Sequence, residues 1–231
     1  ALTSGDNNVS IGTSSGNAIT SGGSNVSLGT NTLATATTAL NNTALGHNAM
    51  VNVKAGVAVD GCVAIGFESL YGNSSNTTGI NNTIAIGDSA LKALTTGASN
   101  VAVGYQAGTA ITEGVANVAL GTAALSTNVE GDYNTAIGHQ SLETFNSADV
   151  GQNTAVGINT LQAMQTGVNN VAIGAFAMDG ATSGASSDNV AIGLNAMGGA
   201  IAAEIVDDCV AIGSGALSGA LDSTNGVDEA S

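Results

Sequence analysis

Two histidines and two cysteines have the most versatile side-chain chemistry in this sequence, because they can act as nucleophiles, acids, bases or metal ligands. His47 and His139 each directly follow a glycine, and Cys62 and Cys209 each directly precede the sequence Val-Ala-Ile-Gly. Nucleophilic catalysis needs a convergent group such as serine, histidine and a carboxylate. Serine and aspartate are spread evenly along this chain and arginine is absent, so we expect neither enzymatic activity nor a cofactor.

These four residues occupy fixed places because the chain is an internal repeat of 17 to 21 residues. Each repeat is centred on a glycine that follows Ala or Ser and then Ile, Leu or Val. A regular period of this length is typical of repeat architectures. These glycines, called repeat glycines below, are Gly12, Gly29, Gly46, Gly66, Gly87, Gly104, Gly121, Gly138, Gly157, Gly174, Gly193 and Gly213.

Nine of the twelve repeats carry an asparagine four residues before the repeat glycine, and Cys62, Thr83 and Cys209 take its place in the others. Equivalent amides in stacked repeats can hydrogen-bond to one another and to backbone groups of the turns. We therefore expect a ladder formed by Asn8, Asn25, Asn42, Asn100, Asn117, Asn134, Asn153, Asn170 and Asn189.

The residues between this asparagine and the glycine predict a short β-strand, because Val, Ala and Ile follow one another without a polar residue. A unit of 17 to 21 residues is too short for a hairpin with its own core, but it fits one rung of a parallel β-solenoid. Twelve rungs spaced by about 4.8 Å give a rod about 55 Å long. We expect Val and Ile to fill the interior, and Asn, Ala and Gly to form a flat outer face.

The remainder of each rung leaves two alternatives open. The segments DSALKALTTG and NTLQAMQTG place apolar residues at helical spacing before a glycine, which is typical of a short helix. A second short strand would fit the same length. The unbroken period predicts a single repeat domain over residues 1–231, with the solenoid at about 8–217 and a polar, acidic tail at 218–231.

Stacking of rungs would separate residues that are equivalent in the repeat. His47 and His139 lie five rungs apart, about 24 Å, so one metal ion cannot bind both; three copies of one of them could meet on a trimer axis. Cys62 and Cys209 lie eight rungs apart, about 38 Å, which is too far for a disulfide within one chain. We expect each cysteine to replace asparagine in the stacked row.

The composition is acidic, with 17 Asp and Glu residues against two lysines and a net charge of −15. Long-range repulsion opposes binding to nucleic acid or to an anionic membrane surface. No stretch approaches the roughly 18 consecutive apolar residues of a membrane span, so we expect no membrane insertion. The calcium-binding spacings of EF-hands and of glycine-rich nonapeptides are absent, and we expect a solvated acidic face.

The repeat resembles the head repeats of trimeric autotransporter adhesins, in which Asn precedes a Val-Ala-Ile-Gly core. The longer unit in SNTTGINNTIAIGDSAL and NNVAIGAFAM looks more like the related repeats of bacteriophage tail fibres. The resemblance covers the chain from Asn8 to Leu217. It implies a parallel β-roll that associates as a homotrimer, in a virion fibre or a bacterial cell-surface adhesin whose exposed loops attach to a host.

These observations predict a structural or adhesive fibre segment, located on a virion or outside the cell, that contacts a surface glycan or protein. The residue directly after each repeat glycine varies widely, which favours a recognition role for His47, Phe67, Tyr105 and His139. One alternative is an ice-binding solenoid. It would need a regular threonine column, whereas Thr95, Thr112 and Thr166 are interrupted by Val129. Another alternative is a self-polymerising extracellular filament.

Overall fold

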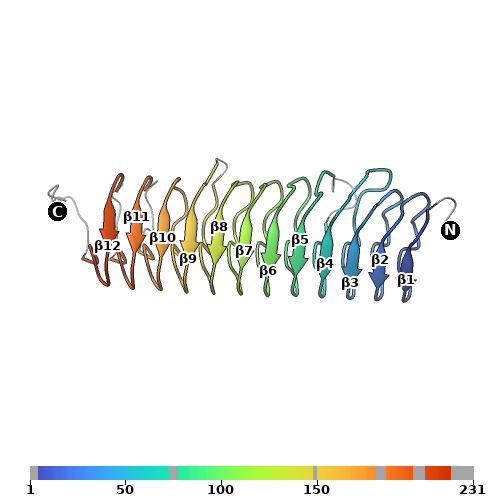
Figure 1. Ribbon diagram of the computed structural model, residues 1–231, viewed down its shortest axis with the longest axis horizontal. Helices are drawn as coiled ribbons and strands as arrows, with labels where there is room; N and C mark the ends of the chain where they lie inside the picture. The colour runs from blue at the N-terminus through green and yellow to red at the C-terminus, as the bar shows by residue number, and fades with distance from the viewer. Residues whose placement is uncertain (1–4, 73–77, 148–149, 181–185, 200–205, 220–231) are drawn as a thin grey trace.

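The computed structural model shows a parallel β-solenoid in which twelve short strands stack into one sheet (Figure 1). It describes residues 5–72, 78–147, 150–180, 186–199 and 206–219. Each strand pairs in parallel only with its neighbours in sequence, so the strand order is simply the chain order. About eleven turns of chain connect the strands, and the first and last strands lie at opposite ends of the rod (Figure 1). The predicted solenoid is confirmed.

Each rung is numbered here by its strand, and every strand has three residues. The strands are β1 (Val9–Ile11), β2 (Val26–Leu28), β3 (Thr43–Leu45), β4 (Val63–Ile65), β5 (Ile84–Ile86), β6 (Val101–Val103), β7 (Val118–Leu120), β8 (Thr135–Ile137), β9 (Thr154–Val156), β10 (Val171–Ile173), β11 (Val190–Ile192) and β12 (Val210–Ile212).

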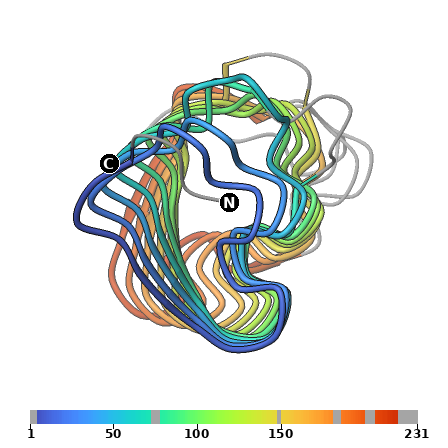
Figure 2. The ribbon, with the colours of Figure 1, turned by 90° about the vertical axis from the view of Figure 1, so that its right-hand side faces the viewer.

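The register of the sheet follows the sequence repeat without a slip. Val118 pairs with Thr135, and Ala119 pairs with Ala136. Equivalent residues pair in this way between all neighbouring strands, although the repeats differ in length. Viewed along the rod, the rungs lie over one another and rotate gradually from one end to the other (Figure 2). Insertions are therefore absorbed in the segments between strands.

The prediction that Val and Ile fill the interior is wrong. The central residue of each strand, Ala or Ser, points inward, and Ala64, Ala85 and Ala136 are fully buried. The first and third residues of each strand point outward and are half-exposed or exposed. Alternation along a strand allows either orientation. The small central residue faces inward here because large side chains from the other segments of the rung occupy the interior.

Those large side chains come mostly from the residue four places after the repeat glycine. This residue is Leu or Met in most rungs, and Leu70 and Leu91 are fully buried. Phe145, the largest fully buried side chain, enters the interior from a later position in its rung. The core is therefore a stack of small strand residues facing large residues from the non-strand segments.

The segment after the repeat glycine is neither a helix nor a second strand in the described residues. The residues two and four places after the glycine both adopt left-handed backbone conformations, for example Glu68 with φ 50° and Leu70 with φ 48°. A right-handed helix and a β-strand both require negative φ at every residue. The apolar spacing that suggested a helix instead comes from turns that direct Leu or Met inward.

The sheet of the solenoid extends from β1 to β12. The predicted acidic tail, residues 218–231, lies outside the described residues from residue 220 onward.

Candidate functional site

The asparagine column forms a ladder of side-chain amides, most of them buried, inside the rod. The Oδ1 atom of Asn100 accepts hydrogen bonds from both the backbone nitrogen and Nδ2 of Asn117, at 2.9 and 3.2 Å. Asn117 Nδ2 also donates to the backbone oxygen of Gly131 at 2.9 Å. The same pattern runs through Asn134, Asn153, Asn170 and Asn189. Each amide thus ties two neighbouring rungs together, and its role is structural.

The ladder is interrupted where rungs 4 and 5 carry Cys62 and Thr83. The backbone nitrogen of Cys62 still donates to Asn42 Oδ1 at 2.9 Å, and its Sγ donates to the backbone oxygen of Ile80 at 3.1 Å. Thr83 is fully buried, and its hydroxyl has no hydrogen-bond partner among the residues that the structure describes. The amide ladder is therefore split into two parts, one before rung 4 and one from Asn100 onward.

The two cysteines are free thiols at equivalent places in the ladder. Cys209 receives the same backbone contact as Cys62, because its nitrogen donates to Asn189 Oδ1 at 3.0 Å. The prediction that both cysteines replace asparagine in the stacked row, unpaired with each other, is confirmed. Burial raises the pKa of the Cys62 thiol to about 11, so this side chain is a small apolar core residue and not a nucleophile.

The outward residues of the strands form a second long feature, called the strand face below. It consists of the first and third residues of β1 to β12, which are Val, Ile, Leu or Thr in every rung. Leu28, Ile137 and Ile173 on this face are exposed, and so are both outward residues of β1 and of β12. The strand face is an aliphatic surface that runs along all twelve strands.

The predicted recognition residues lie in one column at a corner of the rungs, directly after the repeat glycines. Backbone hydrogen bonds fix this corner column in register, since the oxygens of His47, Phe67 and Asp88 accept from the next rung. His47, Phe67, Asp88 and Tyr105 therefore occupy rungs 3 to 6 in succession. The rings of His47 and Phe67 are 5.5 Å apart, and Phe67 and Tyr105 are 45% and 52% exposed.

An ion pair lies on the same stretch of the rod. Lys92 Nζ is 2.7 Å from a carboxylate oxygen of Glu68 and 6.0 Å from the centre of the Tyr71 ring. The hydrogen bond to Glu68 raises the pKa of Lys92. Sequence analysis missed this group, although Glu68 and Lys92 belong to adjacent repeats. Their contact depends on the left-handed turns, which bring two different positions of the repeat onto one surface.

The aromatic patch is defined as His47, Phe67, Tyr71 and Tyr105 together with the Glu68–Lys92 ion pair. It contains three of the six Phe and Tyr residues of the chain and spans only rungs 3 to 6. His139 is not part of it. His139 lies in the same corner column on rung 8, about 10 Å beyond Tyr105 at two rung spacings. Of the four predicted recognition residues, the structure brings the rings of His47 and Phe67 into contact. Tyr105 and His139 lie two and four rungs beyond Phe67 in the same column.

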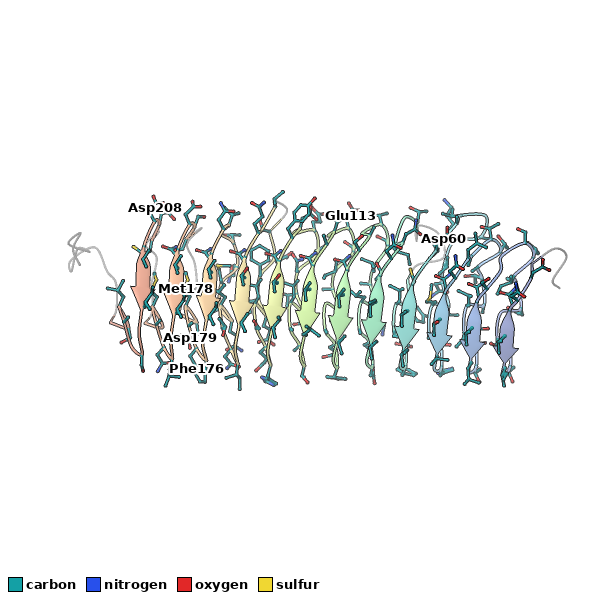
Figure 3. All side chains as sticks on the ribbon, viewed as in Figure 1. Asp60, Glu113, Phe176, Met178, Asp179 and Asp208 are labelled. Atoms are coloured by element: carbon teal, nitrogen blue, oxygen red, sulfur yellow. The ribbon has the colours of Figure 1, made fainter. Side chains whose placement is uncertain are left out.

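Acidic side chains along one edge contribute to the hydrogen bonding of the rod (Asp60 is labelled in Figure 3). Asp60 and Asp132 each lie six residues before a repeat glycine, and their Oδ1 atoms accept the backbone N–H of Leu40 and Val115 at 3.0 and 2.7 Å. Asp207 accepts a backbone N–H of the preceding rung in the same way. Part of the acidic surface therefore cross-links rungs in addition to being solvated.

Within the described ranges, no group of three or more His, Cys, Asp or Glu side chains is placed to hold a metal ion. The described residues also include no helix long and apolar enough to span a membrane. No protein-family model matches the chain, and no curated protein or solved structure shows significant similarity to it.

Proposed function

We propose that this chain is a non-enzymatic segment of a trimeric fibre, either a phage tail fibre or a bacterial surface adhesin, that takes part in attachment to a host. The strand face carries this proposal. Val, Ile and Leu side chains form a row along the whole rod. Burying this row against a partner would be favourable by about 25 cal/mol for each Å² of apolar surface removed from water. Contiguous apolar surfaces of this kind mark interaction sites.

The strand face fits a second and third copy of the same chain better than an unrelated partner. The third residue of every strand is Val, Ile or Leu, so identical rods placed side by side would present matching aliphatic surfaces along their full length. The spacing of about 4.8 Å between rungs would be shared by all copies. Three copies are proposed because the repeat resembles those of trimeric adhesins and tail fibres. Two copies would also cover the face, and a mass measurement separates the two cases.

The aromatic patch supports a role in recognition. Exposed aromatic side chains are scarce in a chain with 3% aromatic residues, and Phe67 and Tyr105 lie two rungs apart with Asp88 between them. Aromatic rings provide large contact areas with little conformational freedom to lose. The neighbouring ion pair of Glu68 and Lys92 adds hydrogen-bonding groups of both signs. This combination suits a host-surface glycan or protein.

The ice-binding alternative receives no support from the threonine column. The hydroxyls of Thr95 and Thr112 donate to backbone oxygens of the next rung, at 2.9 and 3.3 Å, and are engaged within the rod. The column continues through Val129, whose backbone nitrogen donates to Asn146 Oδ1, and the backbone nitrogen of Asn146 donates to the oxygen of Gln165, not to that of Thr166. A regular array of free threonine hydroxyls is therefore not formed along these rungs.

Sedimentation equilibrium tests the oligomeric state. We expect a mass three times the 22.1 kDa of one chain at micromolar concentration. Ile86→Lys, in the middle of the strand face, should lower the assembly to smaller species while circular dichroism still shows a folded rod. Thr122→Lys, in the corner column, is the matched control and should remain trimeric. A wild-type chain that stays monomeric would refute the proposal.

Adhesion tests the recognition part of the proposal separately. The labelled protein is applied to arrays of glycans and of extracellular-matrix proteins, together with Phe67→Ala, Tyr105→Ala and a control, Ile158→Ala, from the same corner column. We expect the two aromatic variants to lose about tenfold or more in affinity for whichever array component binds, in line with the cost of truncating an aromatic anchor. Equal binding by all variants would exclude the aromatic patch as the recognition surface.

A further inference from the structure

A polar groove crosses rungs 7, 8 and 9 on a surface that belongs to neither the strand face nor the aromatic patch. Its volume is about 370 Å³, and it is lined by Thr127, Thr144, Asn146, Gln165 and Thr166. Ligand sites range from about 300 to 1,000 Å³, so the groove is large enough for one or two sugar rings. It is called the threonine groove below.

The walls of the threonine groove are held in place by the backbone of the next rung. Thr127 Oγ1 donates to the backbone oxygens of Glu143 and Phe145, at 2.7 and 3.3 Å. Thr144 Oγ1 makes the equivalent pair of contacts one rung later, with the shorter at 2.6 Å. Asn146 Oδ1 accepts from the backbone nitrogen of Val129 at 3.3 Å. A ligand would therefore meet pre-organised walls, which reduces the entropy lost on binding.

The groove also contains polar groups that the protein leaves unused. Among the described residues, neither Asn146 Nδ2, the amide of Gln165 nor the hydroxyl of Thr166 has a protein hydrogen-bond partner. The amide nitrogens are donors, and the amide oxygen and the hydroxyls can accept. Donors and acceptors within one small groove match the hydroxyl groups of a sugar, each of which can donate and accept.

The absence of charged side chains from the groove lining favours an uncharged ligand. None of its five lining side chains is ionisable. The nearby carboxylate of Glu143 accepts hydrogen bonds from Gln140 Nε2 and Gln162 Nε2, at 2.9 and 2.7 Å. A ligand carboxylate or phosphate would find no cation in the groove and would be repelled by a chain of net charge −15. We propose that the threonine groove binds a neutral saccharide through Asn146, Gln165 and Thr166.

This inference does not depend on the proposed function, because none of the groove residues belongs to the strand face or the aromatic patch. A chain that proved to be a monomer, or whose aromatic patch proved inert, could still bind a sugar here.

Saturation-transfer NMR of the full chain tests the inference with galactose, glucose and N-acetylglucosamine as neutral probes and N-acetylneuraminic acid as an anionic one. We expect weak binding of at least one neutral probe. Gln165→Ala should lower its affinity about 3- to 10-fold, the effect of losing one or two neutral hydrogen bonds. The matched control is Thr20→Ala, at the same position of rung 1, which should bind like the wild type. Circular dichroism verifies that both variants keep the fold.

Three results would overturn the inference. One is the absence of binding by every neutral probe, and another is unchanged binding by Gln165→Ala. The third is stronger binding of N-acetylneuraminic acid than of any neutral probe, because it would show that charge and not hydroxyl pattern determines recognition.

Discussion

The backbone oxygen of Gly66 lies 2.6 Å from the position that a Cβ atom on Gly46 would occupy. The same close approach links the other repeat glycines to the glycine of the next rung, up to Gly193 and Gly213. Gly46 also has a φ of 123°, a conformation that side chains strongly disfavour. Glycine is thus required in this column for two reasons, the positive φ and the close contact between the backbones of neighbouring rungs.

Replacing Gly46 with alanine is expected to lower the free energy of unfolding by about 3 kcal/mol or more, since backbone strain and a clash with a backbone atom both contribute. Gly56→Ala is the control. Gly56 also has a positive φ, 78°, but no atom lies within 4 Å of a Cβ built there, so its loss should be only about 1 to 2 kcal/mol. Urea denaturation at a fixed protein concentration measures both. Equal losses would show that the clash between rungs is unimportant.

Much of the fold can be read from the sequence because the repeat itself encodes the stacking. Aligning the twelve repeats gives the register, the asparagine ladder and the corner column directly. The orientation of the strands could not be obtained in the same way. Ala64 and its neighbours Val63 and Ile65 are all apolar, so the pattern within a strand of three residues does not indicate which face is buried.

One signal of the orientation was nevertheless present in the sequence. Where the ladder carries Asn117 or Asn170, the residue three places earlier is a glycine, and a Cβ on Gly114 would lie 3.0 Å from Asn117 Nδ2. Where Cys62, Thr83 and Cys209 replace asparagine, that residue is instead Val59, Ile80 and Val206, all buried. A large side chain three residues before the ladder thus accompanies a small one in the ladder, and a glycine there accompanies asparagine. This exchange of volume indicates that the two positions pack against each other in the interior. It is visible only when the two positions are compared along the repeats.

This exchange predicts strong coupling between Thr83 and Ile80. Thr83→Asn should cost about 1 to 3 kcal/mol because the longer side chain meets Ile80. Ile80→Gly should cost about 3 kcal/mol or more because it leaves a cavity. The double variant should be more stable than the sum of these losses by at least about 1 kcal/mol, since it restores the arrangement of the asparagine rungs. Additive losses in a double-mutant cycle would mean that the two columns do not pack against each other.

The buried strand centre predicts the response to larger side chains there. Ala136 and Ala172 are fully buried, so replacing either with leucine should lower the free energy of unfolding by about 1 to 3 kcal/mol through overpacking. Thr135→Leu is the control from the same strand, because Thr135 points outward, and it should change stability by less. Thermal unfolding followed by circular dichroism distinguishes the two positions. A larger loss from Thr135→Leu would reverse the assignment of the faces.

Cys62 predicts a loss of stability in alkaline solution. Burial is the main cause that raises the pKa of its thiol from 9.0 to about 11 in the folded chain. A thiol that is harder to ionise when folded contributes its full stability below the unfolded pKa, near 9.0. Between the two pKa values the unfolded chain releases the proton and the folded chain keeps it, so stability falls as the pH rises. The total loss, complete only above the folded pKa of about 11, is roughly 3 kcal/mol, the free energy of two pKa units.

Urea denaturation between pH 8 and 11 measures this slope for the wild type, for Cys62→Ala and for Cys209→Ala. In Cys62→Ala the free energy of unfolding should fall less steeply with pH, because the thiol no longer contributes. This variant should also be less stable than the wild type at pH 8, because side-chain volume is lost from the core. Cys209→Ala should retain most of the pH dependence, because Cys209 is only partly buried.

Alkylation of the folded wild type supplies an independent test. Since iodoacetamide reacts with the thiolate, Cys209 should be modified first and Cys62 only as the rod unfolds. Modification of both thiols at one rate would contradict the burial of Cys62 in the ladder.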